Sequence, residues 1–247
     1  MQEKVNHLVE WLQEQVQDAG VNGLLVGISG GIDSAVVAHL IQRAFPKQSL
    51  GVVLPCKSNP GDQEAAYKVI ESCGIESLTV DLTKTHNVLY STVQQQLETK
   101  GDYNENQERL ADANLRARLR MSTLYTLATN YKYLVVGTDN AAEWHTGYFT
   151  KYGDGGVDLV PLLHLTKGEV RDLARELGVP SEIVDKAPSA GLWEGQTDEK
   201  EMGVTYDTID SYLKGEEIPA EDKKIIDDMH KRTEHKRQLA AAPKAFD

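Results

Sequence analysis

A glycine- and hydroxyl-rich loop at residues 27–34 is the feature that most constrains the fold. It lies between an apolar run at 24–26 and an apolar-periodic stretch that begins at Ala35, an order that predicts strand, turn and helix. Such a turn presents free backbone N–H groups and the positive end of the helix dipole, which together bind phosphate. The sequence therefore predicts an α/β fold with a nucleotide-binding loop.

The spacing within this loop excludes two common phosphate-binding motifs. The Walker pattern needs a lysine and the dinucleotide fingerprint needs G-x-G-x-x-G, and the loop has neither. Asp33 occupies the position where a cation is expected, and a carboxylate beside phosphates is tolerated mainly when it binds a divalent metal. The loop thus predicts ATP with Mg²⁺, with a purely structural turn of the same composition as the alternative.

Apolar runs and helical patterns alternate along the first half of the chain. This order predicts a doubly wound parallel sheet with helices on both faces. Ligands bind beyond the carboxyl ends of the strands of such sheets, so we expect the 27–34 and 137–140 loops to face one crevice. The predicted strands are 23–28, 49–54, 77–82 and 132–137, and the predicted helices are 3–19, 33–45, 61–73 and 105–130.

After residue 145 the pattern becomes glycine-rich, with one short predicted helix at 166–177. Residues 185–203 have several glycines and little periodicity, which predicts a loop that is either a mobile lid or a passive surface connection. No internal repeat or composition break marks a boundary, so we predict a single domain over 1–247.

Composition excludes several classes of protein. No apolar run is long enough for a membrane span and the N-terminus lacks the order of a signal peptide, so we expect a cytoplasmic protein with no membrane partner. A net charge of −12 disfavours a nucleic-acid partner. Cys56 and Cys73 lack metal-site spacing, so we interpret both as small buried hydrophobic residues.

The motifs resemble a known family. Ser29 to Ser34 is similar to the PP-loop of the ATP pyrophosphatases, which cleave ATP between its α and β phosphates. Further blocks at 137–143, 147–156, 158–162 and 233–237 follow in an order that resembles the ammonia-dependent NAD synthetases over essentially the whole chain. The resemblance implies an adenine nucleotide alpha hydrolase-like sheet.

The implied reaction is the amidation of deamido-NAD⁺ to NAD⁺. In that family the nicotinate carboxylate attacks the α-phosphorus of ATP, which gives an adenylated intermediate and pyrophosphate, and ammonia then displaces AMP. This chemistry needs positioning and charge neutralisation more than a nucleophile. The sequence has no convincing Ser-His-Asp or Cys-His set, which fits that requirement.

The resemblance also implies site residues. Asp33 and Glu143 would bind Mg²⁺, Asp33 and Lys167 would act in catalysis, and Glu143 taken alone would read as an exposed helix residue. The implied ATP-binding residues are Gly27, Ile28, Ser29, Gly30, Gly31, Ile32, Asp33, Ser34, Thr138, Lys167 and Ser189. The implied deamido-NAD⁺-binding residues are Arg118, Lys151, Asp158, His235 and Lys236.

Some of these positions have simpler interpretations. Arg116, Arg118 and Arg120 repeat at every second residue, so a helix spreads them over different faces, and we expect only Arg118 to bind. The basic run at 230–237 is also typical of a helix C-terminus that complements its dipole. Two positions depart from the family: Gly191 stands where many relatives have an acid, and Trp144 where a small residue is frequent.

The family forms homodimers through the long helix after the third strand, so the resemblance implies a dimer that uses residues 105–130. At 247 residues we expect no glutaminase domain and therefore free ammonia as the nitrogen donor. The competing functions are other PP-loop enzymes, such as the amidating half of GMP synthetase or tRNA-thiolating enzymes, and a non-catalytic ATP-binding module. The acidic charge and the two cysteines disfavour the thiolating enzymes.

Overall fold

A parallel four-stranded sheet organises the computed structural model, which describes residues 1–188 and 197–244. The strand order is β3-β2-β1-β4, and Leu25 at the centre of β1 pairs with Leu50 of β2 and Val135 of β4. All three pairings are parallel, as predicted. The strands are β1 (Gly23–Gly27), β2 (Ser49–Val53), β3 (Glu76–Thr79) and β4 (Tyr133–Val136).

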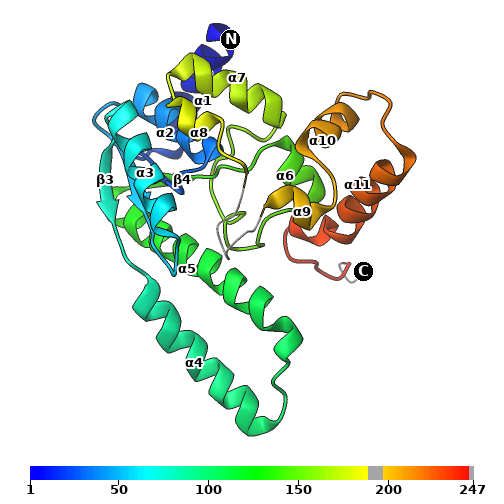
Figure 1. The fold of residues 1–247 in the computed structure, drawn as a ribbon. Helices are drawn as coiled ribbons and strands as arrows, with labels where there is room; N and C mark the ends of the chain where they lie inside the picture. The colour runs from blue at the N-terminus through cyan, green and yellow to red at the C-terminus, as the bar shows by residue number, and fades with distance from the viewer. Residues whose placement is uncertain (189–196, 245–247) are drawn as a thin grey trace.

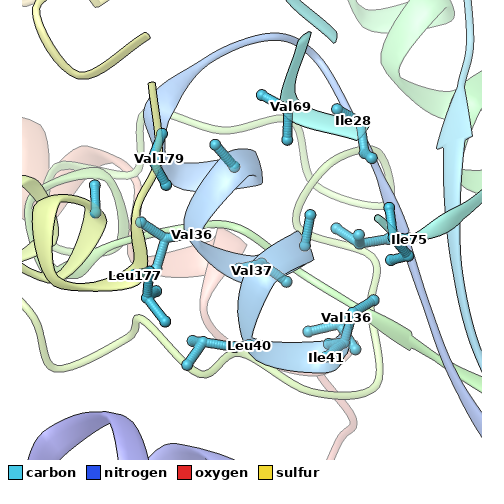
Figure 2. Close-up of a cluster of buried hydrophobic side chains, with 14 of the residues drawn as sticks. Ile28, Val36, Val37, Leu40, Ile41, Val69, Ile75, Val136, Leu177 and Val179 are labelled. Atoms are coloured by element: carbon cyan, nitrogen blue, oxygen red, sulfur yellow. The ribbon is translucent and has the colours of Figure 1, made fainter. Parts of the chain in front are cut away.

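The larger core lies between one face of the sheet and helix α2. Figure 2 shows Val36, Val37, Leu40 and Ile41 of this helix packed among side chains from the sheet and from neighbouring helices. Because residues of α2 are buried all around its circumference, this helix is fixed on every side. The helices on this face are α1 (Gln2–Ala19), α2 (Ile32–Ala44), α3 (Pro60–Cys73), α7 (Lys167–Leu177) and α8 (Ser181–Val184).

The opposite face is covered by α5 (Glu108–Tyr131), which follows the 3₁₀ turn Glu105–Gln107 and confirms the predicted long helix. Leu25, Val52 and Val135 form a second core there, with α5 side chains packed against it. The sequence analysis did not predict α4 (Thr83–Lys100), which pairs with α5 in an arm that projects from the body (Figure 1). Val88 and Val93 of α4 are exposed, so this helix has no buried stripe on which a periodicity argument depends.

A small helical cluster closes the molecule on the C-terminal side (Figure 1). It consists of α6 (Ala141–Thr146), α9 (Asp198–Met202), α10 (Tyr206–Leu213) and α11 (Ala220–Arg232), followed by the 3₁₀ turn Glu234–Lys236. Met202, Ile209 and Ile226 are its buried centre. The prediction of a loop throughout 185–203 was wrong at α9, because Met202 is an apolar anchor that buries this turn of helix.

Local sequence signals account for several helix ends. The Thr166 side chain accepts from the backbone N–H of Glu169, and the Glu169 side chain accepts from the backbone N–H of Thr166. These two hydrogen bonds form a capping box at the start of α7. Gly178 ends this helix in the left-handed conformation. The basic residues His230, Lys231 and Arg232 occupy the last turn of α11, which confirms the helix-terminus interpretation of that part of the basic run.

The remaining composition-based predictions have mixed outcomes. Cys56 is buried and Cys73 is half-buried, and both thiols are free. Among the described residues, no helix combines the length and the apolar character that a membrane span requires. The single domain over 1–247 stays a prediction.

Candidate active site

The loop between β1 and α2 is closed by its own serines. The Ser29 backbone N–H donates to Ser34 Oγ over 3.2 Å, and Ser34 Oγ donates to the Gly31 carbonyl over 2.9 Å. Gly30 has φ +80°, and a Cβ there would lie 2.6 Å from the Asp62 carbonyl oxygen of α3, so this position requires glycine. Gly31 caps α2 without a side-chain hydrogen bond, and a helix start of this kind can bind an anion through its first N–H groups.

Asn140, the N-cap residue of α6, connects this loop to that helix. Its Nδ2 donates to Asp33 Oδ1 over 2.9 Å, while its Oδ1 accepts from the backbone N–H groups of Ala142 and Glu143. Glu143 Oε2 in turn accepts from the Asn140 backbone N–H over 3.1 Å. Asn140 thus contacts both carboxylates that the sequence singled out, Asp33 through its side-chain amide and Glu143 through its backbone N–H. The sequence analysis did not assign Asn140, although its N-x-x-E spacing is that of a capping box.

Lys167 is the cation between these two acids. Its Nζ lies 2.6 Å from Asp33 Oδ2 and 3.3 Å from Glu143 Oε1, and its side chain is 2% exposed. Burial opposes the positive charge, but the carboxylates of Asp33 and Glu143 outweigh that effect and raise the pKa of Lys167. For Glu143, burial disfavours the negative charge and raises the pKa to about 7, although the positive charge of Lys167 acts to lower it. The structure therefore brings together the three charged residues on which the predicted chemistry depends.

Three further polar residues at this site were missed by the sequence analysis. The Tyr206 hydroxyl lies 3.0 Å from Glu143 Oε1 and 3.1 Å from Asp198 Oδ2. Asp139 is buried, and its Oδ2 has no hydrogen-bond partner among the described residues. Burial and the nearby charges of Asp154 and Glu143 raise the pKa of Asp139. Asp139 lies in the 137–143 block, but a lone acid after a strand gives no signal of its burial.

The donor set fits a Mg²⁺ ion bound together with phosphate. Asp33 Oδ2 and Glu143 Oε1 both approach Lys167 Nζ, so the two carboxylates lie close together, and Asp139 has a buried oxygen without a hydrogen-bond partner among the described residues. No cluster of three or more potential metal ligands occurs within residues 1–188 and 197–244. Mg²⁺ is commonly held by one or two carboxylates plus substrate phosphates and water, so two protein ligands satisfy its usual requirement.

A cavity of about 690 Å³ lies between the sheet and the C-terminal helices, and its wall includes Asp33, Asp139, Glu143 and Lys167. Gly30 is absent from the cavity wall because it faces α3, and Ser189 lies outside the described residues, as does Gly191. Of the residues predicted to bind ATP, metal or deamido-NAD⁺, the wall contains Gly27, Ile28, Ser29, Gly31, Ile32, Asp33, Ser34, Thr138, Glu143, Lys167 and Lys236.

Four of the five predicted dinucleotide-binding residues fall into two groups. Arg118 donates to the Lys151 carbonyl, and Lys151 Nζ donates to the carbonyls of His235 and Gln238. Arg118, Lys151 and His235 therefore form one strip, which lies outside the cavity wall. Lys236 instead reaches into the cavity, where Nζ donates to the Gly147 and Phe149 carbonyls.

Asp158 has local partners. One carboxylate oxygen accepts from the Tyr125 hydroxyl over 2.9 Å, and the other accepts from the Val135 backbone N–H over 2.8 Å. These contacts tie α5 to β4. The structure therefore shows a role in packing for Asp158, and its contact with substrate stays a prediction.

The three arginines of α5 point in different directions, as their spacing predicts. Arg116 pairs with Asp112, whereas Arg118 is exposed. Arg120 lines the cavity and donates to the Leu54 carbonyl and to Ser58 Oγ. The expectation that only Arg118 would approach a ligand therefore omitted the arginine that lies in the cavity wall.

The fold and the loop define the class. A parallel sheet whose first strand feeds an S-G-G-x-D-S loop has the adenine nucleotide alpha hydrolase fold of PP-loop enzymes. The sequence profile described as NAD synthase matches residues 4–240. The chain belongs to the NAD synthase family.

Individual relatives agree with this assignment. The NH(3)-dependent NAD(+) synthetase of Alkaliphilus oremlandii is 56% identical over 244 residues, which cover 99% of this chain and 98% of the relative. The solved NMN synthetase from Francisella tularensis has a TM-score of 0.92 at 40% identity, with 99% of this chain and 98% of that chain covered. The NAD+ synthetase from Burkholderia pseudomallei has a TM-score of 0.77 at 30% identity, with coverage of 97% and 90%.

Proposed function

We propose that this protein is an ammonia-dependent NAD⁺ synthetase, a ligase that amidates deamido-NAD⁺ with ATP and ammonia. The observation that carries the proposal is the convergence of Asp33, Glu143 and Lys167 beside the glycine loop, in a chain of the NAD synthase family. Removing charged groups from water costs free energy even when they are paired. A passive nucleotide sensor has no need of a buried cation between two acids that carries this cost.

Each part of the site has a role in that reaction. The N–H groups at the start of α2, with the hydroxyls of Ser29 and Ser34, would bind the pyrophosphate portion of ATP. Lys167 would stabilise the negative charge that develops on the α-phosphate when the nicotinate carboxylate attacks it. Asp33 and Glu143 would hold Mg²⁺, which supplies positive charge to the ATP oxygens when bound. Thr138 and Ser189 would complete the ATP contacts.

The second step requires ammonia to displace AMP from the adenylated nicotinate. Ammonium must lose a proton before nitrogen can attack, and the carboxylates of Asp139 and Asp154 line the same cavity as acceptors of suitable charge.

The strip of Arg118, Lys151 and His235, together with Lys236 and Asp158, is proposed to bind deamido-NAD⁺. In support, the first three are linked at the surface although they are distant in sequence. Their position outside the cavity wall suits a site completed by a second chain, so we propose a homodimer through α4 and α5. Val93 and Leu110, at 50% and 58% exposure, would be covered in it.

The dimer has a direct test. Light scattering should give twice the mass of one chain for the wild type, and Val93→Lys should shift the protein toward monomer because it places a charge in the apolar contact. A wild-type mass of one chain would contradict the dimer.

We further propose that the protein acts in the cytoplasm, where ATP and Mg²⁺ are available.

A second candidate substrate follows from the similarity to the NMN synthetase from Francisella tularensis, whose structure has a TM-score of 0.92 to this chain. Amidation of nicotinate mononucleotide is the same chemistry on a substrate that lacks the adenylate half. The two functions differ in whether the enzyme uses binding energy from that half.

One coupled assay decides between these functions. Purified protein with ATP and Mg²⁺ is given ammonium or glutamine, with deamido-NAD⁺ or nicotinate mononucleotide, and AMP and amide product are measured. We expect turnover with deamido-NAD⁺ and ammonium, and kcat/KM at least tenfold higher than with the mononucleotide. A preference for the mononucleotide would replace the proposed substrate, and no AMP with either substrate would end the proposal.

A further inference from the structure

Helix α10 contacts Lys167 at two points, one on its backbone and one on its side chain. Tyr206 is the first residue of this helix and Asp210 follows one turn later, so both project from the same face. Tyr206 is 0% exposed and Asp210 is 5% exposed. Neither residue is among those that the sequence or the family resemblance assigned.

Asp210 fixes the backbone from which Lys167 projects. Its Oδ1 accepts from the Lys167 N–H over 3.0 Å, and its Oδ2 accepts from the Gly168 N–H over 2.8 Å. These are two of the N–H groups that the first turn of α7 leaves without helical partners. A carboxylate at this end also complements the dipole of α7.

Tyr206 fixes the other end of the same side chain. Its ring centroid lies 4.6 Å from Lys167 Nζ, so the negative face of the ring is against the ammonium. Its hydroxyl lies within hydrogen-bond distance of Glu143 Oε1, the same oxygen that Lys167 Nζ approaches to 3.3 Å. Removal of the hydroxyl therefore takes one contact from Glu143 Oε1, and removal of the ring also takes the ring contact from the Lys167 ammonium.

We propose that helix α10 positions the Lys167 ammonium and the Glu143 carboxylate for Mg·ATP, with Tyr206 and Asp210 as the positioning residues. The role of Lys167 and Glu143 rests on the proposed function, but their placement by α10 does not. Burying the polar oxygens of Tyr206 and Asp210 is unfavourable unless they have hydrogen-bond partners. A helix used only for packing would carry apolar side chains at these two positions and avoid that cost.

The test compares Tyr206→Phe and Asp210→Asn with the wild type. Phenylalanine keeps the ring and removes the hydroxyl, and asparagine keeps one acceptor but loses the charge and the second acceptor. Calorimetric titration of Mg·ATP, without the second substrate, should show affinity weakened about tenfold or more for each variant. In the steady state, KM for ATP or kcat should change while KM for deamido-NAD⁺ stays within twofold.

Tyr212→Phe is the matched control on the same helix. The Tyr212 hydroxyl donates to Asp227 over 2.6 Å, outside the cavity wall, so its loss should leave Mg·ATP affinity unchanged. Circular dichroism and thermal melting establish that each variant is folded. If Tyr206→Phe does not fold, the affinity of Asp210→Asn decides.

The outcomes separate this inference from the proposed function. Mg·ATP affinity within twofold of wild type in a folded Tyr206→Phe or Asp210→Asn variant overturns the inference, even if the enzyme makes NAD⁺. An equal loss in Tyr212→Phe also overturns it, because the effect would then be a general one of α10. Weakened binding in the two variants only, in a protein that forms no NAD⁺, supports the inference and rejects the proposed function.

Discussion

Two sides of one cavity are built in different ways. On the sheet side, Asp33 lies on α2, a helix buried on all sides between the parallel strands, α1, α3 and α7. On the C-terminal side, Tyr206 and Asp198 belong to short helices around a small cluster that includes Ile209 and Ile226. The charged residues come from both sides, and hydrogen bonds join the sides: Glu143 of α6 to Lys167 of α7, and Asn140 of α6 to Asp33 of α2.

The difference teaches which side can change independently. Helix α2 is held mainly by hydrophobic burial, because most of its side chains belong to the larger apolar core. Its position therefore depends little on the charges of the site. The C-terminal helices bury less and depend more on polar contacts such as those of Asp210. Stability is not uniform across a protein, and elements with few apolar contacts open first.

The largest expected effect is on chemistry from the rigid side. Asp33→Asn should lower kcat by about 10²–10³-fold with the fold intact, because it removes a charge at the reacting phosphate while the core around α2 is untouched. Steady-state assays and thermal melting measure the two effects. Asp172→Asn, an exposed acid paired with Arg175 on α7, is the control. Near-normal turnover in Asp33→Asn would remove this residue from the site.

Core truncations on the two sides should destabilise different parts of the molecule. Leu40→Ala and Ile226→Ala each remove a fully buried side chain, so each should cost about 2–5 kcal/mol. Amide hydrogen exchange should show that Leu40→Ala lowers protection throughout the sheet. In Ile226→Ala the loss should be confined to α10 and α11. Equal loss in β1 in both variants would show that the two sides unfold as one unit.

The smallest expected effect is a pH dependence on the C-terminal side. The His145 ring stacks on that of His230 at 4.1 Å between centroids, and burial, with the charge of His230, lowers the pKa of His145 to about 4. Because the unfolded pKa is 6.5, the unfolded state binds more protons between pH 6.5 and 4, and stability falls as pH is lowered through this window.

The magnitude of that loss is modest. His145 is half-buried, so we discount the shift for solvent screening and expect about 1 kcal/mol lost between pH 7 and pH 5. Urea unfolding of the wild type and of His145→Gln at both pH values isolates the contribution. A variant with the same pH dependence as the wild type would assign the loss to other groups.

The sequence predicted the sheet side well for physical reasons. Buried parallel strands are continuous apolar runs, and amphipathic helices such as α1 have a periodicity that a single sequence reveals. The site loop was predicted because glycine at position 30 and the hydroxyls of Ser29 and Ser34 are tied to local backbone geometry. These signals are all local in sequence.

The rest depended on contacts between distant residues. Tyr206 meets Glu143 across 63 positions, and Lys167 meets Asp33 across 134, so no spacing rule connects them. Helix α4 was missed because Val88 and Val93 are exposed on it. The short helices around Ile209 lack the length over which periodicity is recognised. The resemblance to the family, rather than any pattern, indicated Lys167 and Glu143.

Asn140 restricts how the site can be redesigned. Aspartate at this position would retain an Oδ1 acceptor for the backbone N–H groups of Ala142 and Glu143, so α6 would still begin there. It would, however, replace the donor that faces Asp33 at 2.9 Å with a like charge. A substitution that is conservative for the helix is thus disruptive for the nucleotide, and asparagine satisfies both requirements with one planar group.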